Sequence, residues 1–422
     1  MDRQDMFAEK NLVKIIGISG CRAPSNLKQL LSGCVAICSS SRLKEALATE
    51  IKALDPQPAI IPITPLGDMF EGLEKHLEKG HCAVFASGDP MFFGIGKRLI
   101  KRFGPERVQI FPALSAMQLA CARLGLCWDD AQVLSLHGRR DETIYPLMLS
   151  SPKSIIFTDG RNSPDVICKK LMELLHGAGD KEATSSIIVH VAEELECPGE
   201  RIRSMDLLQA SLETFSPLNI MILEVKDADL LPSKGIGLNE QEIYHLRGMI
   251  TKDEIRAVTL HRLRIAPGQV LWDIGAGSGS VGLEAARLYP DLTCYAIEMD
   301  RQQQGVIRQN IEKFRLFNLI PIKGVAPDVL IGLPPPNRVF VGGSRGRLEE
   351  IIGYCARAIL PGGIIVVNAI LEKTSQDAPS FMEHAGLEVD MIHVSVTRDG
   401  KRHRTHLNPI TIIRGMKKGV TG

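Results

Sequence analysis

Short apolar runs alternate with amphipathic stretches through the first half of the chain. Four runs lie before residue 115, KIIGIS, CVAICSS, CAVFASG and VQIFPAL, and four more follow residue 128, AQVLSLHG, SIIFTDG, SSIIVHVAE and NIMILEV. Runs of about four to eight residues rich in Val and Ile are typical of buried strands, and the stretches between them are typical of helices. The pattern predicts an α/β fold with parallel strands joined by helices, in which the later runs form a second α/β layer.

The alternation stops between residues 226 and 240, where the sequence reads KDADLLPSKGIGLNE. This segment is polar, rich in Gly and Pro and without periodicity, as is typical of linkers. A chain of 422 residues also exceeds the usual size of one domain, which is about 100 to 200 residues. We therefore predict two domains, residues 1–228 and residues 236–422.

The second half begins with an amphipathic stretch at residues 250–265 and continues with a new series of strands and helices. Thr251 precedes the first helical turn as an N-cap would, and Asp253 and Glu254 in that turn interact favourably with the helix dipole. The strongest chemical signal follows in VLWDIGAGSGSVGLEAARL, residues 270–288, where a predicted strand meets a glycine-rich loop and then a helix.

The glycine-rich loop at residues 275–279 lets a ligand approach the backbone, because glycine has no Cβ. The next predicted strand ends at Glu298, 21 residues after Gly277, where a carboxylate accepts hydrogen bonds from the hydroxyls of a ribose. Later strand-to-loop steps occur at PIKGVAPDVL, which contains Ala326, at RVFVGGSRG and at GGIIVVNAIL. They should converge on the same crevice, since ligands of parallel sheets bind beyond the carboxyl ends of the strands.

Two ligands compete for this crevice. Gly277, Gly279 and Gly282 also satisfy GxGxxG, the fingerprint of dinucleotide-binding loops. Asp273, at the end of the strand before the loop, would place a negative charge beside a diphosphate, and two anions repel each other in a dry crevice. The same carboxylate would stabilise the ammonium and sulfonium groups of S-adenosylmethionine. The sequence therefore favours S-adenosylmethionine over a nicotinamide dinucleotide, and a glycine turn without a ligand is the third interpretation.

Composition excludes several other classes of protein. With 44% hydrophobic residues, 23% charged residues and a net charge of +1, the chain matches neither a disordered protein nor one that binds polyanions. No apolar run approaches the roughly 18 to 20 residues that span a bilayer, and MDRQDMFAEKN lacks the apolar stretch of a signal peptide. We expect a cytoplasmic protein that binds neither membranes nor nucleic acid.

The cysteines and histidines show no metal-ligand or redox spacing. The ten cysteines are scattered, Cys34 and Cys38 are the nearest pair, and no CxxC occurs. Free buried thiols are the expected state of these residues. His403 and His406 are the only close histidine pair of the second half, and one pair gives no reason to expect a metal.

Six motifs occur in order in the second half: ITKDEIRAV, LWDIGAGSGS, AIEMD, GVAPDVL, FVGGS and VNAILE. In this order they resemble the CbiT methyltransferases of cobalamin biosynthesis, a Rossmann-like class I family that uses S-adenosylmethionine. The resemblance implies that the cofactor contacts Thr251, Gly275, Ala276, Gly277, Ser278, Gly279, Glu298 and Ala326, and the charge argument adds Asp273. Val325 departs from the family, which commonly has an acidic residue there, so adenine anchoring is not carried over to this position.

The first half contains FASGDPMFFGIG, FPALSAMQLACARLG, SLHGRR and FTDGRNSP. These motifs resemble the tetrapyrrole methylase fold, specifically its CbiE branch, in which two α/β lobes hold S-adenosylmethionine between them. The SGDP loop, residues 87–90, forms part of that cradle, where Gly88 permits a tight turn and Pro90 fixes the backbone. The cofactor-binding residues implied are Gly17, Gly88, Asp89, Pro90, Ser115 and Ala116. An ordinary strand-to-helix turn capped by Asp89 is the alternative.

The two resemblances follow each other in the order of the fused, decarboxylating precorrin-6Y C5,15-methyltransferases of the CobL type. This order implies methylation of a precorrin-6 type corrin precursor at C5 and C15, with loss of carbon dioxide from the acetate at C12. It also implies a small-molecule tetrapyrrole as the partner and a homo-oligomeric state.

Two alternatives stay open. A nucleic-acid methyltransferase would share the loops of the second half, but the chain lacks an (N/D)PP(Y/F) motif, and PPPN at residues 334–337 precedes its strand. A scaffold role, in which the first domain only binds the tetrapyrrole, fits its departures from the family at GISGCRAP and CSSSRL.

Catalytic residues are not predicted, because methyl transfer to an electron-rich ring carbon mainly requires alignment and desolvation. A substrate rich in carboxylates is expected to meet arginines, which bind carboxylates through two parallel hydrogen bonds. The candidates are Arg345 after the glycine pair, Arg404 within the cluster of Arg398, Lys401, Arg402 and His403, and His137 with Arg139 and Arg140. The alternatives are a solvated hairpin turn around Asp399 and Gly400 for the cluster, and plain surface charge for the others.

Overall fold

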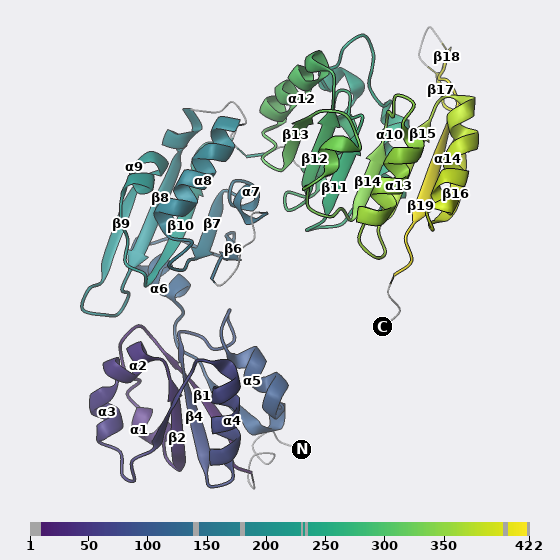
Figure 1. Cartoon of the computed structure of the whole chain (residues 1–422). Helices are drawn as coiled ribbons and strands as arrows, with labels where there is room; N and C mark the ends of the chain where they lie inside the picture. Colours follow the sequence, from purple (N-terminus) through teal and green to yellow (C-terminus); the bar gives the residue numbers. More distant parts are fainter. Residues whose placement is uncertain are drawn as a thin grey trace. The chain divides into compact units, whose positions relative to one another are not determined.

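Figure 1 shows the computed structural model of the chain, which describes residues 10–137, 143–177, 182–228, 231–232, 235–399 and 404–419. The chain forms two compact units. One comprises Met1–Arg139, Lys153–Val166 and Ile188–Glu224, and the other comprises Arg140–Pro152, Ile167–Ile187 and Val225–Gly422. The last change from one unit to the other lies beside the predicted linker. Two segments of the first half belong to the second unit, which the sequence did not indicate.

The first sheet is parallel throughout, as the alternating pattern predicted. Its strands have the order β3-β2-β4-β1-β5. They are β1 (Val13–Ile18), β2 (Cys34–Ser39), β3 (Ala59–Pro62), β4 (His81–Ser87) and β5 (Val108–Phe111). The helices are α1 (Leu27–Leu30), α2 (Ser41–Ala46), α3 (Ala48–Lys52), α4 (Leu66–Leu77) and α5 (Gly96–Phe103). Separate apolar clusters cover the two faces, one containing Val84 and the other Phe85, as expected for a parallel sheet.

The second sheet differs from the prediction, because it is mixed. Its order is β6-β7-β10-β8-β9, with β6 and β7 parallel, β10 antiparallel to β7 and β9 antiparallel to β8. The strands are β6 (Gln132–Ser135), β7 (Lys153–Phe157), β8 (Ile187–Glu193), β9 (Arg201–Asp206) and β10 (Asn219–Val225). The helices are α6 (Ala116–Leu124), α7 (Ile144–Met148), α8 (Pro164–Gly177) and α9 (Leu207–Leu212). The connection 194–200 allows only an antiparallel return, since a parallel crossover needs about a dozen residues.

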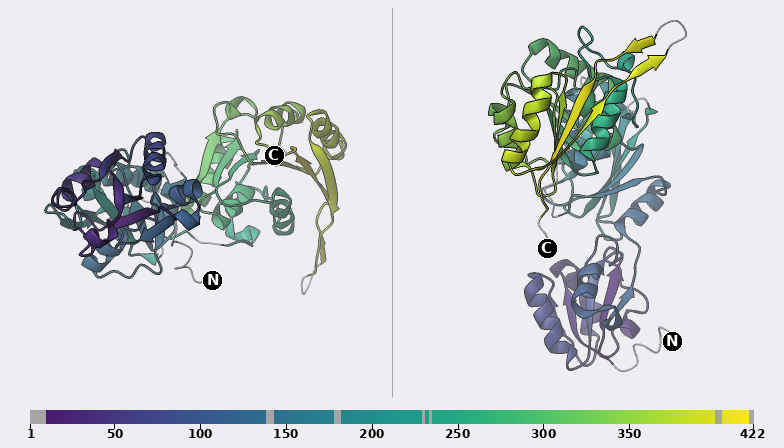
Figure 2. Two further views of the ribbon diagram at one scale, coloured as in Figure 1. Left: turned by 90° about the horizontal axis from the view of Figure 1, so that it is seen from below. Right: turned by 90° about the vertical axis from the view of Figure 1, so that its right-hand side faces the viewer.

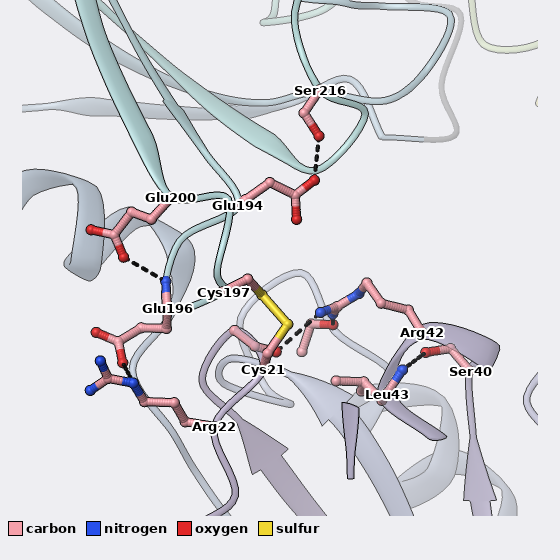
Figure 3. Close-up of a disulfide and its surroundings, with 12 residues drawn as sticks. Cys21, Arg22, Ser40, Arg42, Leu43, Glu194, Glu196, Cys197, Glu200 and Ser216 are labelled. Carbon is pink, nitrogen blue, oxygen red and sulfur yellow. Dashed lines mark hydrogen bonds and ion pairs between the residues drawn. A yellow bond between two sulfur atoms is a disulfide. The ribbon is translucent and has the colours of Figure 1, made fainter. Parts of the chain in front are cut away.

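A disulfide joins Cys21 and Cys197, so the prediction of free thiols is wrong for this pair (Figure 3). Cys21 follows β1, and Cys197 follows β8, 176 positions further along the chain. Spacing does not determine disulfide connectivity, so this pair could not be predicted from the positions of the cysteines. Glu196, beside the disulfide, pairs with Arg22 at 2.7 Å and with Arg123 at 2.6 Å. The other described cysteines are free, and six of them are buried.

The third sheet lies in the second unit and has the strand order β13-β12-β11-β14-β15-β19-β16. The strands are β11 (Val270–Ile274), β12 (Thr293–Glu298), β13 (Leu319–Lys323), β14 (Arg338–Val341), β15 (Ile364–Ala369), β16 (Glu388–Val394) and β19 (Ile410–Met416). The first five are parallel, and β19 runs antiparallel to β15 and β16. The helices are α10 (Asp253–Leu263), α11 (Ser280–Leu288), α12 (Arg301–Phe314), α13 (Leu348–Ala358) and α14 (Glu372–His384).

The start of α10 corrects one prediction. Its N-cap position is Lys252, without a side-chain hydrogen bond, so Thr251 is not the cap. Asp253 and Glu254 lie in the first turn as predicted.

The second part of the predicted linker is anchored to the second unit. Arg256 of α10 and Glu284 of α11, both almost fully buried, form an ion pair at 3.1 Å. The same Glu284 carboxylate accepts hydrogen bonds from the amides of Gly237 and Leu238, at 2.9 and 2.6 Å. Leu238 is buried, which is unlike a free linker residue.

The segment after β16, which contains the basic cluster around Arg404, forms a hairpin. This agrees with the alternative interpretation of that cluster as a hairpin. β17 (Thr397–Asp399) pairs antiparallel with β18 (Arg404–His406), and the hairpin projects from the sheet (Figure 2). Lys401, Arg402 and His403 lie outside the described residues, as do Arg139 and Arg140. Short 3-10 helices occur at Pro105–Arg107, Glu182–Ser186, Glu240–Glu242 and Asp328–Leu330.

In the described ranges, no helix combines the length and the apolar character that crossing a membrane requires. Among the same residues, no three His, Cys, Asp or Glu side chains are grouped so that they could hold a metal ion.

Candidate active site

A cavity of about 880 Å³ opens at the carboxyl ends of the parallel strands of the third sheet. The strand order reverses at β11, between β12 and β14, and ligands of open α/β sheets bind at such a switch point. The lining includes residues that end or follow the five parallel strands: Gly275, Glu298, Ala326, Gly343 and Asn368. The predicted convergence of these loops is confirmed.

The glycines of the loop 275–279 have different roles. Gly275, Gly277 and Gly279 have positive φ angles of +67°, +56° and +75°. A Cβ on Gly275 would lie 2.4 Å from the carbonyl oxygen of Gly343, so this glycine lets two backbone segments touch. A Cβ on Gly277 would meet no protein atom within 4 Å, and Gly277 lines the cavity, so a ligand can approach the backbone there. Gly279 is the N-cap residue of α11 and is not part of the lining.

Glu298 lines the cavity and is held by three backbone amides. Its Oε2 accepts a hydrogen bond from the N–H of Gly277 at 2.9 Å, and its Oε1 accepts from the N–H groups of Met299 and Asp300, both at 2.9 Å. A carboxylate has about four lone-pair sites, so capacity remains for a ligand hydroxyl. The amides fix the orientation of the carboxylate before any ligand binds.

The structure corrects the position of Asp273. The side chain is fully buried and is not part of the cavity lining. Successive side chains of a strand point to opposite faces, and Asp273 faces α11, where its Oδ2 accepts a hydrogen bond from the N–H of Gly282 at 2.9 Å. Burial raises the pKa of this carboxyl to about 7, although the Gly282 amide acts in the opposite direction. Asp273 therefore complements the N-terminal turn of α11 and does not face a ligand.

Four more predicted residues line this cavity: Thr251, Ala276, Ser278 and Ala326. Their contacts with a cofactor stay a prediction. Asn368, at the end of β15, was not predicted although the same strand-end rule applies to it. Its Nδ2 donates to the hydroxyl of the fully buried Thr259 at 2.9 Å, which fixes the amide at the cavity wall.

The candidate arginines separate into two groups. Arg345 lines the cavity, and so does Arg247, which the sequence did not single out. Arg404 pairs with Asp399 of the neighbouring strand at 2.6 Å and is not part of the lining, so the structure does not support a substrate contact for it. Arg398 is likewise occupied, by Glu240 and Glu254, each at 2.7 Å.

A second cavity, of about 1000 Å³, lies in the first unit. Gly88, Asp89, Ser115 and Ala116, which the resemblance implied, line it, and so does His137, a separate candidate for binding the substrate. Their contacts with a ligand stay a prediction. The alternative interpretation of the SGDP loop as a helix-capping turn is wrong, because Asp89 Oδ1 accepts from the N–H of Met91 at 2.8 Å and α5 begins only at Gly96.

Other predicted residues of the first unit have structural roles. Gly17 and Pro90 are not part of the lining. A Cβ on Gly17 would lie 2.3 Å from the carbonyl oxygen of Gly88, so Gly17 allows β1 to approach the SGDP loop. Ser115 forms a capping box with Gln118 at the start of α6.

An aromatic cluster in the same cavity was not predicted. The ring centroids of Phe92, Phe93 and Phe157 lie 4.9 to 5.7 Å apart. Phe93 is 52% exposed and has a φ of +53°, which is unusual for a residue with a side chain. His137 Nδ1 lies 3.1 Å from the carbonyl oxygen of Thr158.

Comparison with known proteins matches one family to the first half of the chain and another to the second half. Residues 26–207 match the family described as Tetrapyrrole (Corrin/Porphyrin) Methylases, and residues 242–410 match the Precorrin methyltransferase domain. A decarboxylating precorrin-6Y C(5,15)-methyltransferase of a Sinorhizobium species is 32% identical over 75% of this chain and 74% of its own length. One from Mycobacterium tuberculosis is 33% identical over 73% and 74%. A crystal structure of a precorrin-6y C5,15-methyltransferase from Geobacter metallireducens is 40% identical, with a TM-score of 0.42, over 43% of this chain and 97% of that chain.

Proposed function

Because the chain belongs to the family of decarboxylating precorrin-6Y C5,15-methyltransferases, we propose that it methylates C5 and C15 of a precorrin-6 type tetrapyrrole with S-adenosylmethionine. The proposal includes loss of carbon dioxide from the acetate at C12 and places the reaction in cobalamin biosynthesis. As a member of this family, the chain is a C-methyltransferase.

One observation carries the choice of cofactor: carboxylates already occupy the amides that would bind an anion. The N–H of Gly277 donates to Glu298 and the N–H of Gly282 donates to Asp273, each at 2.9 Å. In a dinucleotide-binding loop, amides in these places bind the diphosphate. Here a diphosphate at Gly277 would lie against the carboxylate of Glu298, which lines the cavity, and the Gly282 amide is already taken by the buried Asp273. A cofactor with cationic sulfonium and ammonium groups meets no such repulsion from Glu298.

S-adenosylmethionine supplies a methyl group on a positively charged sulfur. The protein has to bind, orient and desolvate the reactants, since the conjugated ring provides the electrons. Glu298, fixed by three amides, is oriented to accept the ribose hydroxyls. Ile274, Ile297 and Ile351 give part of the cavity an apolar wall that excludes water.

The cavity of the first unit is proposed as a second S-adenosylmethionine site, which would account for a second methylation. The scaffold alternative has one observation in its favour. Arg42 lines this cavity and donates to the carbonyl oxygen of Gly20 at 3.0 Å and to Ser87 Oγ at 2.7 Å. A guanidinium beside the SGDP loop suits the carboxylates of a tetrapyrrole better than a cationic cofactor.

Counting bound S-adenosylmethionine per full chain tests both proposals. Calorimetric titration of the unmodified protein should give two sites. Gly277→Val should remove one of the two sites, because the added side chain would meet no protein atom and would project into the cavity. Gly386→Val is the matched control, since Gly386 also has a positive φ and an open surrounding but lines neither cavity.

The outcomes are distinct. One site in the unmodified chain and none in Gly277→Val would support the scaffold role of the first unit. Full binding by Gly277→Val would contradict the proposed C-terminal site.

The proposal also covers a cytoplasmic location, a homo-oligomeric state and a small-molecule substrate in place of nucleic acid. The net charge of +1 supports the last point, because proteins that bind nucleic acid usually carry a basic surface. Cell fractionation and sedimentation test the first two.

A further inference from the structure

Two turns that line the cavity of the second unit are built in the same way. The turns 246–249 and 344–347 have an arginine followed by a glycine in the middle, Arg247 with Gly248 and Arg345 with Gly346. The amide of the fourth residue donates to the carbonyl of the first, at 2.9 and 3.0 Å. The central φ angles are +51° and +72° in one turn and +48° and +86° in the other. This is the pattern of a type I′ turn.

Arginine is an unfavourable choice at the first central position of such a turn. Gly, Asn and Asp dominate there, because a Cβ crowds the backbone in the left-handed region. Arg264 and Arg315 also have left-handed backbone, but they are the C-cap residues of α10 and α12, where this conformation ends a helix. Arg247 and Arg345 end no helix. Strained residues of this kind concentrate at ligand sites.

The charges of both arginines are free to act on a ligand. Both residues are exposed, both line the cavity, and within the described part of the chain neither forms an ion pair. Nearby cations behave differently. Arg347 pairs with Asp328 and Glu350, and Lys252, which also lines the cavity, pairs with Glu240.

We infer that Arg247 and Arg345 are a two-point anchor for carboxylates of the substrate in this cavity, and that the strained turns aim the two guanidinium groups. The inference rests on the proposed function and deepens it, since it assigns the acidic side chains of the tetrapyrrole to two named residues. Each guanidinium binds one carboxylate through two parallel hydrogen bonds. Two anchors fix the ring in position and rotation, which is the alignment that methyl transfer needs.

The test uses the full chain and uroporphyrin, a metal-free tetrapyrrole with carboxylates on every ring, as the probe. Arg247→Gly and Arg345→Gly should each weaken its binding about tenfold, and the double variant about a hundredfold. Arg264→Gly is the matched control, because it removes the same charge at the same backbone conformation outside the cavity. It should bind the probe as the unmodified protein does.

Two further readouts separate an anchor from a structural role. Glycine suits the turn better than arginine, so the melting temperature of both variants should be equal or higher. The salt dependence of probe binding should be weaker in both variants, because an ionic contact is lost. Affinity for S-adenosylmethionine should not change.

Unchanged probe binding in the double variant would overturn the inference, as would no probe binding by the unmodified chain. A lower melting temperature together with weaker binding of S-adenosylmethionine would assign the arginines a structural role and also overturn it. Failure of the unmodified chain to bind S-adenosylmethionine would count against the proposed function instead, and the two failures are therefore distinguishable.

Discussion

At the scale of single residues, the most unusual group is the carboxyl of Asp273. It is fully buried between β11 and α11, and only one of its oxygens has a hydrogen-bond partner among the described residues. Its pKa of about 7 means that it is partly protonated at neutral pH. A buried carboxyl costs stability when it is ionised, and the N-terminal turn of α11 offsets part of that cost.

This raised pKa predicts how stability changes with pH. The folded protein binds a proton on Asp273 more tightly than the unfolded chain, whose carboxyl has a pKa near the ordinary 3.8. The contribution of Asp273 to the free energy of unfolding is therefore fully present below about pH 4 and is lost as the pH rises through about 7. Asp273→Asn, which keeps the shape without the charge, should gain stability over the unmodified protein between these pH values, on the order of 2–4 kcal/mol above pH 7.

Urea unfolding of both proteins at several pH values measures this difference. A difference that is constant with pH, or one that favours the unmodified protein as the pH rises, would contradict the assignment.

Sequence reasoning found the residues at strand ends and misjudged those within strands. The glycines and Glu298 were predicted because they follow a recognisable strand. The position of Asp273 was wrong, because a side chain one residue inside a strand points to the face that the pleat dictates. Thr251 was wrong as a cap because helix boundaries are uncertain by one or two residues. Arg247 carried no local signal, since its left-handed φ appears only in the structure.

At the scale of elements, apolar periodicity predicted nearly all of the strands in the interior of the sheets. It did not predict several of the edge strands or the direction in which strands pair. β3, β9, β16 and β19 were missed, and β10 was expected to run parallel. Strand direction depends on the partner and on the length of the connection, which hydrophobic pattern does not encode. The disulfide shows the same limit, because it links the loops after β1 and β8, which meet only in the folded protein.

The disulfide predicts a measurable loss of stability on reduction. It closes a loop of 176 residues, and the chain-entropy model gives about 5 kcal/mol as its largest contribution. Cys21→Ser and treatment with dithiothreitol should lower the melting temperature of the first unit by the same amount. Cys127→Ser, which removes an exposed free thiol, is the control. Identical melting curves with and without dithiothreitol, or two additional reactive thiols in the native protein, would show that the bond does not form.

At the scale of the whole molecule, the order of the two halves predicted the family, and the comparisons confirmed it. Each half has its own cavity. The cavity of the first half lies beside the SGDP loop, and that of the second half lies at the carboxyl ends of the parallel strands. The last change from one unit to the other lies beside the predicted linker, and the two domains with their bounds stay a prediction. Leu238 within the predicted linker is buried and donates a hydrogen bond to Glu284, which is unlike a free linker residue. The proposed function assigns one methylation to each of the two cavities.

The most direct test of the account is the mass of the product that the purified full chain forms from precorrin-6Y and S-adenosylmethionine. Two methyl groups gained and one carbon dioxide lost per substrate molecule is the predicted result. One methyl group gained, or none, with the carbon dioxide retained, would contradict a decarboxylating enzyme with two transfer sites.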